Sequence, residues 1–363
     1  MKLERARLYH VRNYQDEVFF FSPGLNLILG NNAQGKTNLL ESVYIACIGK
    51  AFRTSRLRDI LMIGQTQYEL RLIFNDSRRD WDFRLRGTGS DRIMELDQQK
   101  LDKRSQLFGH FPMILFSPEH LKMVRDGPSA RRSFLDREMS LQSKVYFHEL
   151  IRYNKVLGAR NVVLKDQQPD HAMLDVYDEQ LVRYGTLVYE RRKEFIEKLS
   201  LKAAEIHHEF TGGAEALALA YESDLNKPDD YLDKLRQTRL RDQKQGTTGF
   251  GIHLDDMSIT INETDVRRFG SQGQVRLSAL SIFLALTGFI EAGLGTKPII
   301  LLDDVFSELD RERKTNVLER LSDYQTLITT TDTDGLDEAM IEHAHIITIA
   351  DGKNIGGKID ERK

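Results

Sequence analysis

Two distant parts of this sequence carry the halves of one phosphate-binding site. Residues 30–37 read G-N-N-A-Q-G-K-T, which fits the pattern G-x-x-x-x-G-K-[ST]. Near the other end of the chain, the apolar residues 299–302 run into Asp303 and Asp304. In proteins with this pattern, the hydroxyl group after the lysine and an acidic side chain at a strand end reach the same Mg²⁺. The two parts must therefore fold against each other, around all the residues between them.

The residues on either side of the first motif suit its chemistry. Residues 25–29 have the pattern of a short strand, and residues 38–45 have that of a helix. A strand, a Gly-rich loop and a helix together aim backbone N–H groups at phosphate. We expect Lys36 to reach the β- and γ-phosphates of ATP and Thr37 to hold Mg²⁺. The predicted ATP-binding residues of this loop are Gly30, Asn31, Asn32, Ala33, Gln34, Gly35, Lys36, Thr37 and Asn38.

A second Gly-containing motif precedes the acidic strand. Residues 270–276 read G-S-Q-G-Q-V-R and open the apolar segment 277–290. Small and amide-bearing residues at this place are typical of a helix N-terminus that receives phosphate. We therefore predict Ser271, Gly273 and Gln274 as further nucleotide contacts. The motif resembles the signature of ABC-type ATPases, which meets the ATP held by the other subunit.

The acidic pair is predicted to supply the metal ligand and the catalytic carboxylate. Asp303 ends the Ile/Leu strand and, with Thr37, is expected to bind Mg²⁺. Asp304 follows where ABC-type ATPases place the residue that polarises the attacking water, and residues 307–310 resemble their dimer-interface loop. The predicted catalytic residues are Lys36, Asp303 and Asp304.

The pattern of apolar residues changes twice along the chain and predicts three parts. Residues 1–118 look mixed α/β, with strand-like runs at 3–11, 17–21, 68–73, 81–85 and 113–116. Residues 119–245 form a helical arm, in which apolar side chains recur near heptad spacing and residues 166–170 mark a turn. Residues 246–363 return to the head. The predicted fold class is α/β, an ABC/SMC-type P-loop ATPase head with an inserted helical lobe.

Composition and charge narrow the class of protein. The 363 residues include one cysteine, Cys47, so no internal disulfide can form, as in proteins of a reducing cytosol. The N-terminus lacks a signal h-region, and the apolar segment 277–290 is too short to span a bilayer. We expect a cytoplasmic protein with no membrane partner.

Two basic clusters stand out from a net charge of −3. They are candidates for DNA phosphate contacts, because affinity for a polyanion depends on local charge. The alternative is an ordinary solvated face, and Arg53 is also a candidate for a nucleotide contact. The predicted DNA-binding residues are Lys50, Arg53, Arg56 and Arg58 in the first cluster and Arg131 and Arg132 in the second.

Motifs spread over essentially the whole chain resemble the RecF family of SMC-type ATPases. Besides the motifs above, they are V-R-N-Y at 11–14, F-R-T-S at 52–55, F-S-P-E-H-L at 116–121, R-R-S-F-L-D at 131–136, Y-N-K-V-L at 153–157, R-N at 160–161 and D-E-Q-L at 178–181. The resemblance implies an ATP-dependent homodimer with slow, DNA-stimulated ATP hydrolysis. It also implies binding to double-stranded DNA at junctions with single-stranded gaps, and cooperation with RecR and RecO in loading RecA.

The sequence departs from the RecF family at one place and, in a way that resembles RecF, from many ABC ATPases at another. The family's G-P-H-R-D-D stretch is G-I-H-L-D-D at residues 251–256, so Leu254 stands where the family has an arginine. Residues 329–331 are threonines where many ABC ATPases have a switch histidine, which leaves γ-phosphate sensing to a threonine hydroxyl or to neighbouring groups. Two other functions remain open from the sequence: an SMC-like chromosome organiser, or the ATPase subunit of another ABC system.

Overall fold

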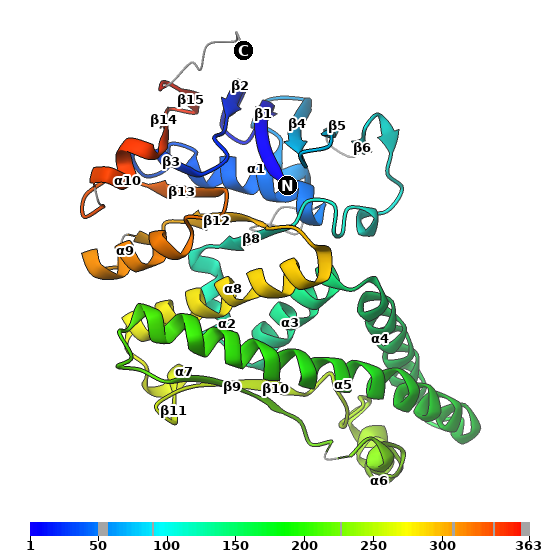
Figure 1. The fold of residues 1–363 in the computed structure, drawn as a ribbon. Coiled ribbons are helices and arrows are strands. Elements are labelled where there is room, and N and C mark those ends of the chain that lie inside the picture. Colours follow the sequence, from blue (N-terminus) through cyan, green and yellow to red (C-terminus); the bar gives the residue numbers. More distant parts are fainter. Residues whose placement is uncertain (50–56, 89–90, 226, 307–308, 337, 357–363) are drawn as a thin grey trace. The chain divides into compact units, whose positions relative to one another are not determined.

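The computed structural model describes residues 1–49, 57–88, 91–225, 227–306, 309–336 and 338–356, and the chain divides into two compact units (Figure 1). The first unit comprises Met1–Leu121, Glu209–Gly212 and Phe283–Lys363. The second unit comprises Lys122–His208 and Gly213–Ile282.

An antiparallel sheet of six strands forms one part of the first unit. Its strand order is β2-β1-β4-β5-β6-β7. In β1, Ala6 and Leu8 are buried while Arg5 and Arg7 are exposed, the alternation expected for a sheet with one covered face. The strands are β1 (Lys2–Val11), β2 (Tyr14–Phe20), β4 (Gln67–Asn75), β5 (Asp80–Thr88), β6 (Arg92–Leu96) and β7 (Gln99–Lys100).

A second six-stranded sheet brings the two ends of the chain together. Its order is β15-β14-β3-β13-β12-β8, and all neighbours except β15 and β14 run parallel. Figure 1 shows the blue strand β3 beside the orange strand β13. Every residue of β8, β12 and β13 is buried, as is typical of parallel strands covered on both faces. The strands are β3 (Leu25–Leu29), β8 (Met113–Phe116), β12 (Ile299–Asp303), β13 (Thr326–Thr330), β14 (His345–Ala350) and β15 (Lys353–Asn354).

Short helices complete the first unit. Helix α1 (Lys36–Ile48) follows β3 through the Gly-rich loop, and most of its side chains are buried. Helix α9 (Arg311–Arg320) begins after Asp310, whose side chain accepts a hydrogen bond from the backbone N–H of Arg313 as an N-cap. Helix α10 is Glu338–His343.

The second unit is mainly helical. Its helices α4 and α5 run antiparallel, because Glu149 pairs with Arg191 near one end and Arg160 pairs with Asp178 near the other. The helices are α2 (Lys122–Arg125), α3 (Pro128–Gln142), α4 (Lys144–Leu164), α5 (His171–Phe210), α6 (Tyr231–Gln245), α7 (Val266–Phe269) and the first part of α8 (Gln272–Leu294). The strands β9 (Leu217–Glu222), β10 (Asp256–Ile261) and β11 (Thr264–Asp265) form a sheet of order β11-β10-β9.

The second unit extends beyond the predicted helical lobe, which ended at residue 245. Strand β10 pairs with β9 over Asp256 to Ile261. This pairing holds the residues after β10, up to Ile282, in the same unit as the helices. The unit boundary consequently lies at Ile282, inside helix α8. The sequence pattern could not locate it, because β9 and β10 are distant in the chain and meet only in the folded sheet.

Helix α8 is longer than the apolar segment predicted at 277–290. Its 23 residues, Gln272–Leu294, are enough by length and composition to cross a membrane. However, 67% of its apolar window is buried inside the protein, as in a core helix. Within the described residues, no other helix passes this test.

Candidate nucleotide site

The Gly-rich loop has the backbone that its sequence requires. Gly35 is the N-cap of α1 with a φ of 119°, and a Cβ placed there would lie 2.6 Å from the side-chain amide nitrogen of Asn13. Any other residue at this position would be strained and would collide with Asn13. Gly35 thus lets the loop turn tightly into the helix whose N-terminus faces the pocket.

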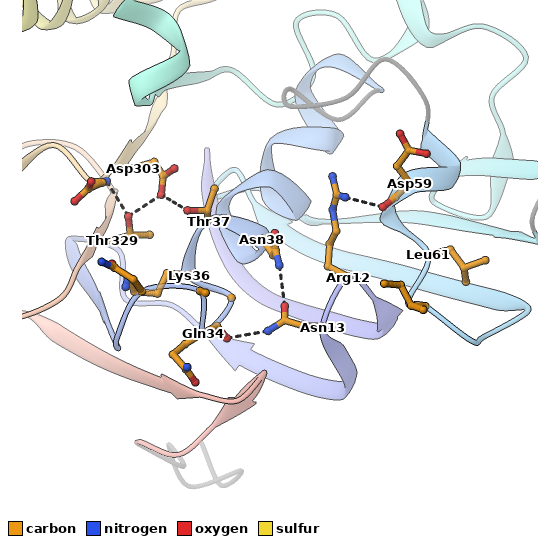
Figure 2. Close-up of a pocket in the computed structure, with 15 residues that line it drawn as sticks. Arg12, Asn13, Gln34, Lys36, Thr37, Asn38, Asp59, Leu61, Asp303 and Thr329 are labelled. Carbon is orange, nitrogen blue, oxygen red and sulfur yellow. Dashed lines mark hydrogen bonds between the residues drawn. The ribbon is translucent and has the colours of Figure 1, made fainter.

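Asn13 braces the loop from the neighbouring strand hairpin. Its side-chain amide nitrogen donates to the backbone oxygen of Gln34 at 2.8 Å, and its side-chain oxygen accepts a hydrogen bond from the Asn38 amide at 2.8 Å (Figure 2). Sequence reasoning noted residues 11–14 only as a family motif and gave them no role. The V-R-N-Y motif at residues 11–14 was visible in the sequence, but the contact of Asn13 with the loop depends on how β1 and β2 pack against it.

The Lys36 amine is held by the loop itself. Its Nζ donates to the backbone oxygens of Gly30 at 2.5 Å and Asn31 at 2.9 Å. Burial lowers the pKa of Lys36, while the nearby Asp304 and Asp303 carboxylates oppose that shift. The amine therefore lies on the loop where phosphate is expected, with carbonyl groups as its present partners.

Thr37 and Asp303 meet directly, although they come from opposite ends of the chain. The Thr37 hydroxyl donates to Oδ1 of Asp303 at 2.8 Å, and the Thr329 hydroxyl donates to the same oxygen at 2.8 Å (Figure 2). Strand β3 carries the loop to this edge and β12 carries Asp303 there, because both are parallel strands of one sheet. The sequence expectation that the two motifs fold together agrees with this geometry.

These oxygens fit the requirements of Mg²⁺. A hydroxyl and a single carboxylate are hard oxygen donors, and Mg²⁺ usually takes few protein ligands and completes its shell with water and phosphate. The described residues contain no cluster of three or more His, Cys, Asp or Glu side chains that could hold a metal by themselves. The arrangement therefore suits a metal that arrives with a nucleotide.

The pocket around these groups has a volume of about 850 Å³. Gly30 and Asn31 contribute their carbonyl groups to Lys36, and the other predicted loop residues line the pocket. Arg12, Asp59, Leu61 and Ile63 lie on its wall and were not predicted. The full lining consists of Arg12, Asn13, Asn32, Ala33, Gln34, Gly35, Lys36, Thr37, Asn38, Asp59, Leu61, Ile63, Asp303, Asp304 and Thr329.

Arg12 anchors one wall of the pocket. Its guanidinium donates to the buried Glu41 carboxylate at 2.7 and 3.0 Å, and to the backbone oxygen of Asp59 at 2.6 Å (Figure 2). These bonds fix the segment around Asp59 against the β1–β2 turn.

The Ser271 motif forms a capping box at the start of α8. The backbone N–H of Ser271 donates to the Gln274 side chain at 2.9 Å, and the backbone N–H of Gln274 donates to the Ser271 hydroxyl at 3.2 Å. The Gln274 amide also donates to Glu215 at 3.0 Å. Ser271 is exposed and Gly273 is partly exposed, so both are accessible on the second unit.

The structure argues against Arg131 as a DNA contact. Only 5% of Arg131 is exposed, and its guanidinium donates to both Asp256 carboxylate oxygens at 2.7 and 2.8 Å and to the Asp126 carbonyl at 2.8 Å. This arginine holds helix α3 to strand β10. Arg132 is partly exposed and donates to the Asp255 carbonyl at 2.7 Å.

The other basic cluster lies largely outside the described residues. The described residues do not include Lys50, Arg53, Arg56 or the side chain of Arg58. The backbone of Arg58 lies in a short 3₁₀ helix (Leu57–Ile60). Their assignment to DNA stays a prediction.

Fold and site together define an SMC-type P-loop ATPase. The chain matches the RecF/RecN/SMC N-terminal domain over residues 2–354, and it belongs to this family. Relatives named DNA replication and repair protein RecF include those of Clostridium botulinum (strain Alaska E43 / Type E3), 38% identical, and Clostridium novyi (strain NT), 37% identical; each alignment covers 97% of this chain and 99% of the relative. The suggested resemblance to RecF is thereby confirmed, as is the predicted fold class.

Solved structures support the same grouping. A structure described as the recombination mediator protein RecF with ATP in the RecFOR pathway is 30% identical, with a TM-score of 0.86 over 97% of this chain and 96% of that one. An SMC head bound to the C-terminal winged-helix domain of ScpA shares the fold, with a TM-score of 0.58 at 17% identity over 97% of this chain and 96% of that one.

Proposed function

We propose that this chain is an ATP-dependent DNA-binding protein of recombinational repair. It dimerises on ATP, binds duplex DNA beside single-stranded gaps, and acts with RecR and RecO in loading RecA. The single observation that supports the ATP part most directly is the hydrogen bond between Thr37 and Asp303 inside the pocket. The repair role rests on the relatives named RecF, and with it goes a cytoplasmic location.

The pocket residues have separate tasks in this proposal. The loop amides and Lys36 bind the phosphates of ATP, while Thr37 and Asp303 hold Mg²⁺, which neutralises phosphate charge. Asp304 lines the pocket and is exposed, so its carboxylate can orient a water and accept its proton. Because Asp is one methylene shorter than Glu, its carboxylate lies farther from that water, which favours slow hydrolysis that resets the dimer.

The capping box on the second unit is the proposed contact with the partner's nucleotide. Ser271, Gly273 and Gln274 of each protomer contact ATP held by the other, so two nucleotides close a two-fold symmetric dimer. DNA that contacts only the closed dimer shifts the population toward it. Slow hydrolysis then releases the DNA.

ATP hydrolysis measured with and without gapped duplex DNA, at several salt concentrations, tests the whole proposal. DNA is expected to stimulate hydrolysis, and the stimulation is expected to fade as salt rises, because phosphate contacts weaken with salt. If DNA stimulates hydrolysis at no salt concentration, the DNA part of the proposal is wrong. ATP binding is judged by a separate measurement.

Ser271→Arg is expected to block ATP-dependent dimerisation and to leave ATP binding by the monomer intact. The arginine places a bulky cation where the partner's γ-phosphate is expected, and it also removes the helix cap, which costs about 1 kcal/mol. Light scattering with and without ATP measures the effect. Two variants serve as controls: Ser271→Ala removes the cap without adding bulk, and Ser258→Arg adds the same cation elsewhere in the second unit. Dimerisation of Ser271→Arg at the wild-type level would refute the assignment.

Replacing both Arg56 and Arg58 by alanine is expected to weaken DNA binding similarly for all sequences. The slope of log affinity against log salt should flatten by about 0.9 for each DNA phosphate that the double variant no longer neutralises. Fluorescence anisotropy with labelled gapped DNA measures it. The exposed Arg78 and Arg92, replaced together, serve as the charge-matched control; an equal change in both double variants would mean that net charge, and no local contact, is responsible.

A further inference from the structure

Thr329 touches both members of the acidic pair through one hydroxyl group. It lies on β13 directly beside Asp303 on β12, and its side chain is buried, with 1% of the residue exposed. Its hydroxyl donates to the Asp303 carboxylate at 2.8 Å and accepts the backbone N–H of Asp304 at 3.0 Å (Figure 2). A hydroxyl has a single proton, so the donation to Asp303 leaves a lone pair of the oxygen for the N–H group of Asp304.

The backbone at Asp304 explains why such a contact matters. Asp304 has a φ of 51°, in the left-handed region that few residues other than glycine adopt. Conformations of this kind persist when neighbouring groups fix them, and they are concentrated at functional sites. The hydrogen bond from the backbone N–H of Asp304 to Thr329 holds this turn from the adjacent strand. The turn directly follows Asp303, the proposed metal ligand, and sets the direction of the Asp304 side chain.

The Asp303 carboxylate is fixed by the same hydroxyl. Its Oδ1 atom accepts hydrogen bonds from Thr37 on one side and Thr329 on the other, both at 2.8 Å. Thr37 is the residue expected to contact Mg²⁺, so the orientation of Asp303 toward the metal is set jointly by the loop and by β13. A rotation of this carboxylate would break the bond to Thr329 and so disturb the support of the Asp304 turn.

We propose that Thr329 is a positioning residue that couples the metal-binding carboxylate of Asp303 to the turn that carries Asp304. Occupation of the metal site is thereby linked to the placement of the proposed water-polarising carboxylate. This inference rests on the proposed ATP site and deepens it, since it assigns a task to the position where the sequence has threonine. The hydroxyl acts on the two aspartates and need not touch the γ-phosphate.

Thr329→Val tests the inference, because valine has the same shape and lacks the hydroxyl group. The variant is expected to bind metal-free ATP as the wild type does. It should bind Mn²⁺ more weakly in the presence of saturating ATPγS, and its kcat should fall by about 10- to 100-fold, as for a missing hydrogen bond to a charged group. Free Mn²⁺ is measured by electron paramagnetic resonance, and hydrolysis by phosphate release.

Two further variants separate positioning from a structural role. Thr329→Ser keeps the hydroxyl and should restore both Mn²⁺ affinity and kcat. Thr326→Val removes a buried hydroxyl at the start of the same strand, which donates to the Tyr324 carbonyl at 3.5 Å, and should leave both quantities unchanged. Thermal unfolding of all three variants reports their folding.

The measurements on these variants can overturn the inference in three ways. The inference is overturned if Thr329→Val matches the wild type in Mn²⁺ affinity and kcat, or if Thr326→Val loses as much. It is also overturned if Thr329→Val loses metal-free ATP binding together with its thermal stability, since Thr329 would then only support the fold. If the wild type binds ATP but hydrolyses none, the proposed reset by hydrolysis fails, and the Mn²⁺ measurement still decides the role of Thr329.

Discussion

Replacing Lys36 by methionine is expected to abolish high-affinity ATP binding. The amine lies on the phosphate loop, and with ATP it is expected to exchange its bonds to the Gly30 and Asn31 carbonyls for bonds to phosphate oxygens. Hydrogen bonds between charged groups contribute about 1.5–3 kcal/mol each, so removing two should weaken binding by about 100-fold or more. Isothermal titration calorimetry with Mg²⁺·ATP measures the change.

The controls for this prediction use the same position. Methionine keeps most of the apolar stem, so the fold should survive, and thermal unfolding can check this. Lys36→Arg keeps the charge and should bind ATP but hydrolyse it poorly, because the larger guanidinium does not fit the geometry of the amine. Normal ATP-stimulated DNA binding by Lys36→Met would exclude the proposed site.

Replacing Asp304 by asparagine is expected to stall hydrolysis with the ATP-bound dimer held on DNA. Asparagine removes the carboxylate that we propose to orient water, and loss of a general base typically costs about 10²- to 10⁴-fold in rate. Asp303 and Thr37, the proposed metal ligands, are unchanged in this variant, so ATP affinity should change little. Residence time on immobilised gapped DNA, with ATP present, is the discriminating measurement.

Asparagine is also the best choice structurally. With a φ of 51° at this position, asparagine is among the few residues that tolerate the backbone, whereas alanine would add strain to the chemical change. Asp304→Glu is the contrasting variant, because it keeps the charge and extends the carboxylate toward the water. If Asp304→Asn failed to bind ATP instead, Asp304 would be reassigned to the metal.

Local patterns were sufficient for the elements that build the phosphate loop. The strand predicted at 25–29 coincides with β3, and the helix predicted at 38–45 lies within α1. The apolar residues 299–302 before Asp303 form a fully buried strand. These predictions succeeded because a parallel strand buried on both faces and a glycine turn into a helix each leave a mark in a few consecutive residues.

Apart from the meeting of Thr37 with Asp303, contacts between distant segments were beyond the reach of the sequence. Arg131 was predicted to face DNA as part of a basic cluster, yet it is buried against Asp256, which lies on a strand far away in the chain. Arg12 and Asn13 line the pocket because β1 and β2 pack beside the loop. A charge in the sequence does not reveal whether its partner is solvent, DNA or a carboxylate brought near by folding.

The sequence by itself was enough to predict the ATP site that we propose, because phosphate and Mg²⁺ recognition requires particular residue types at fixed local spacing. The tertiary structure decided how those residues cooperate. Parallel pairing of β12 with β13 places Thr329 beside Asp303, and the left-handed turn at Asp304 brings a backbone N–H to the same hydroxyl. No spacing in the chain encodes that contact, since it depends on which strands become neighbours in the sheet.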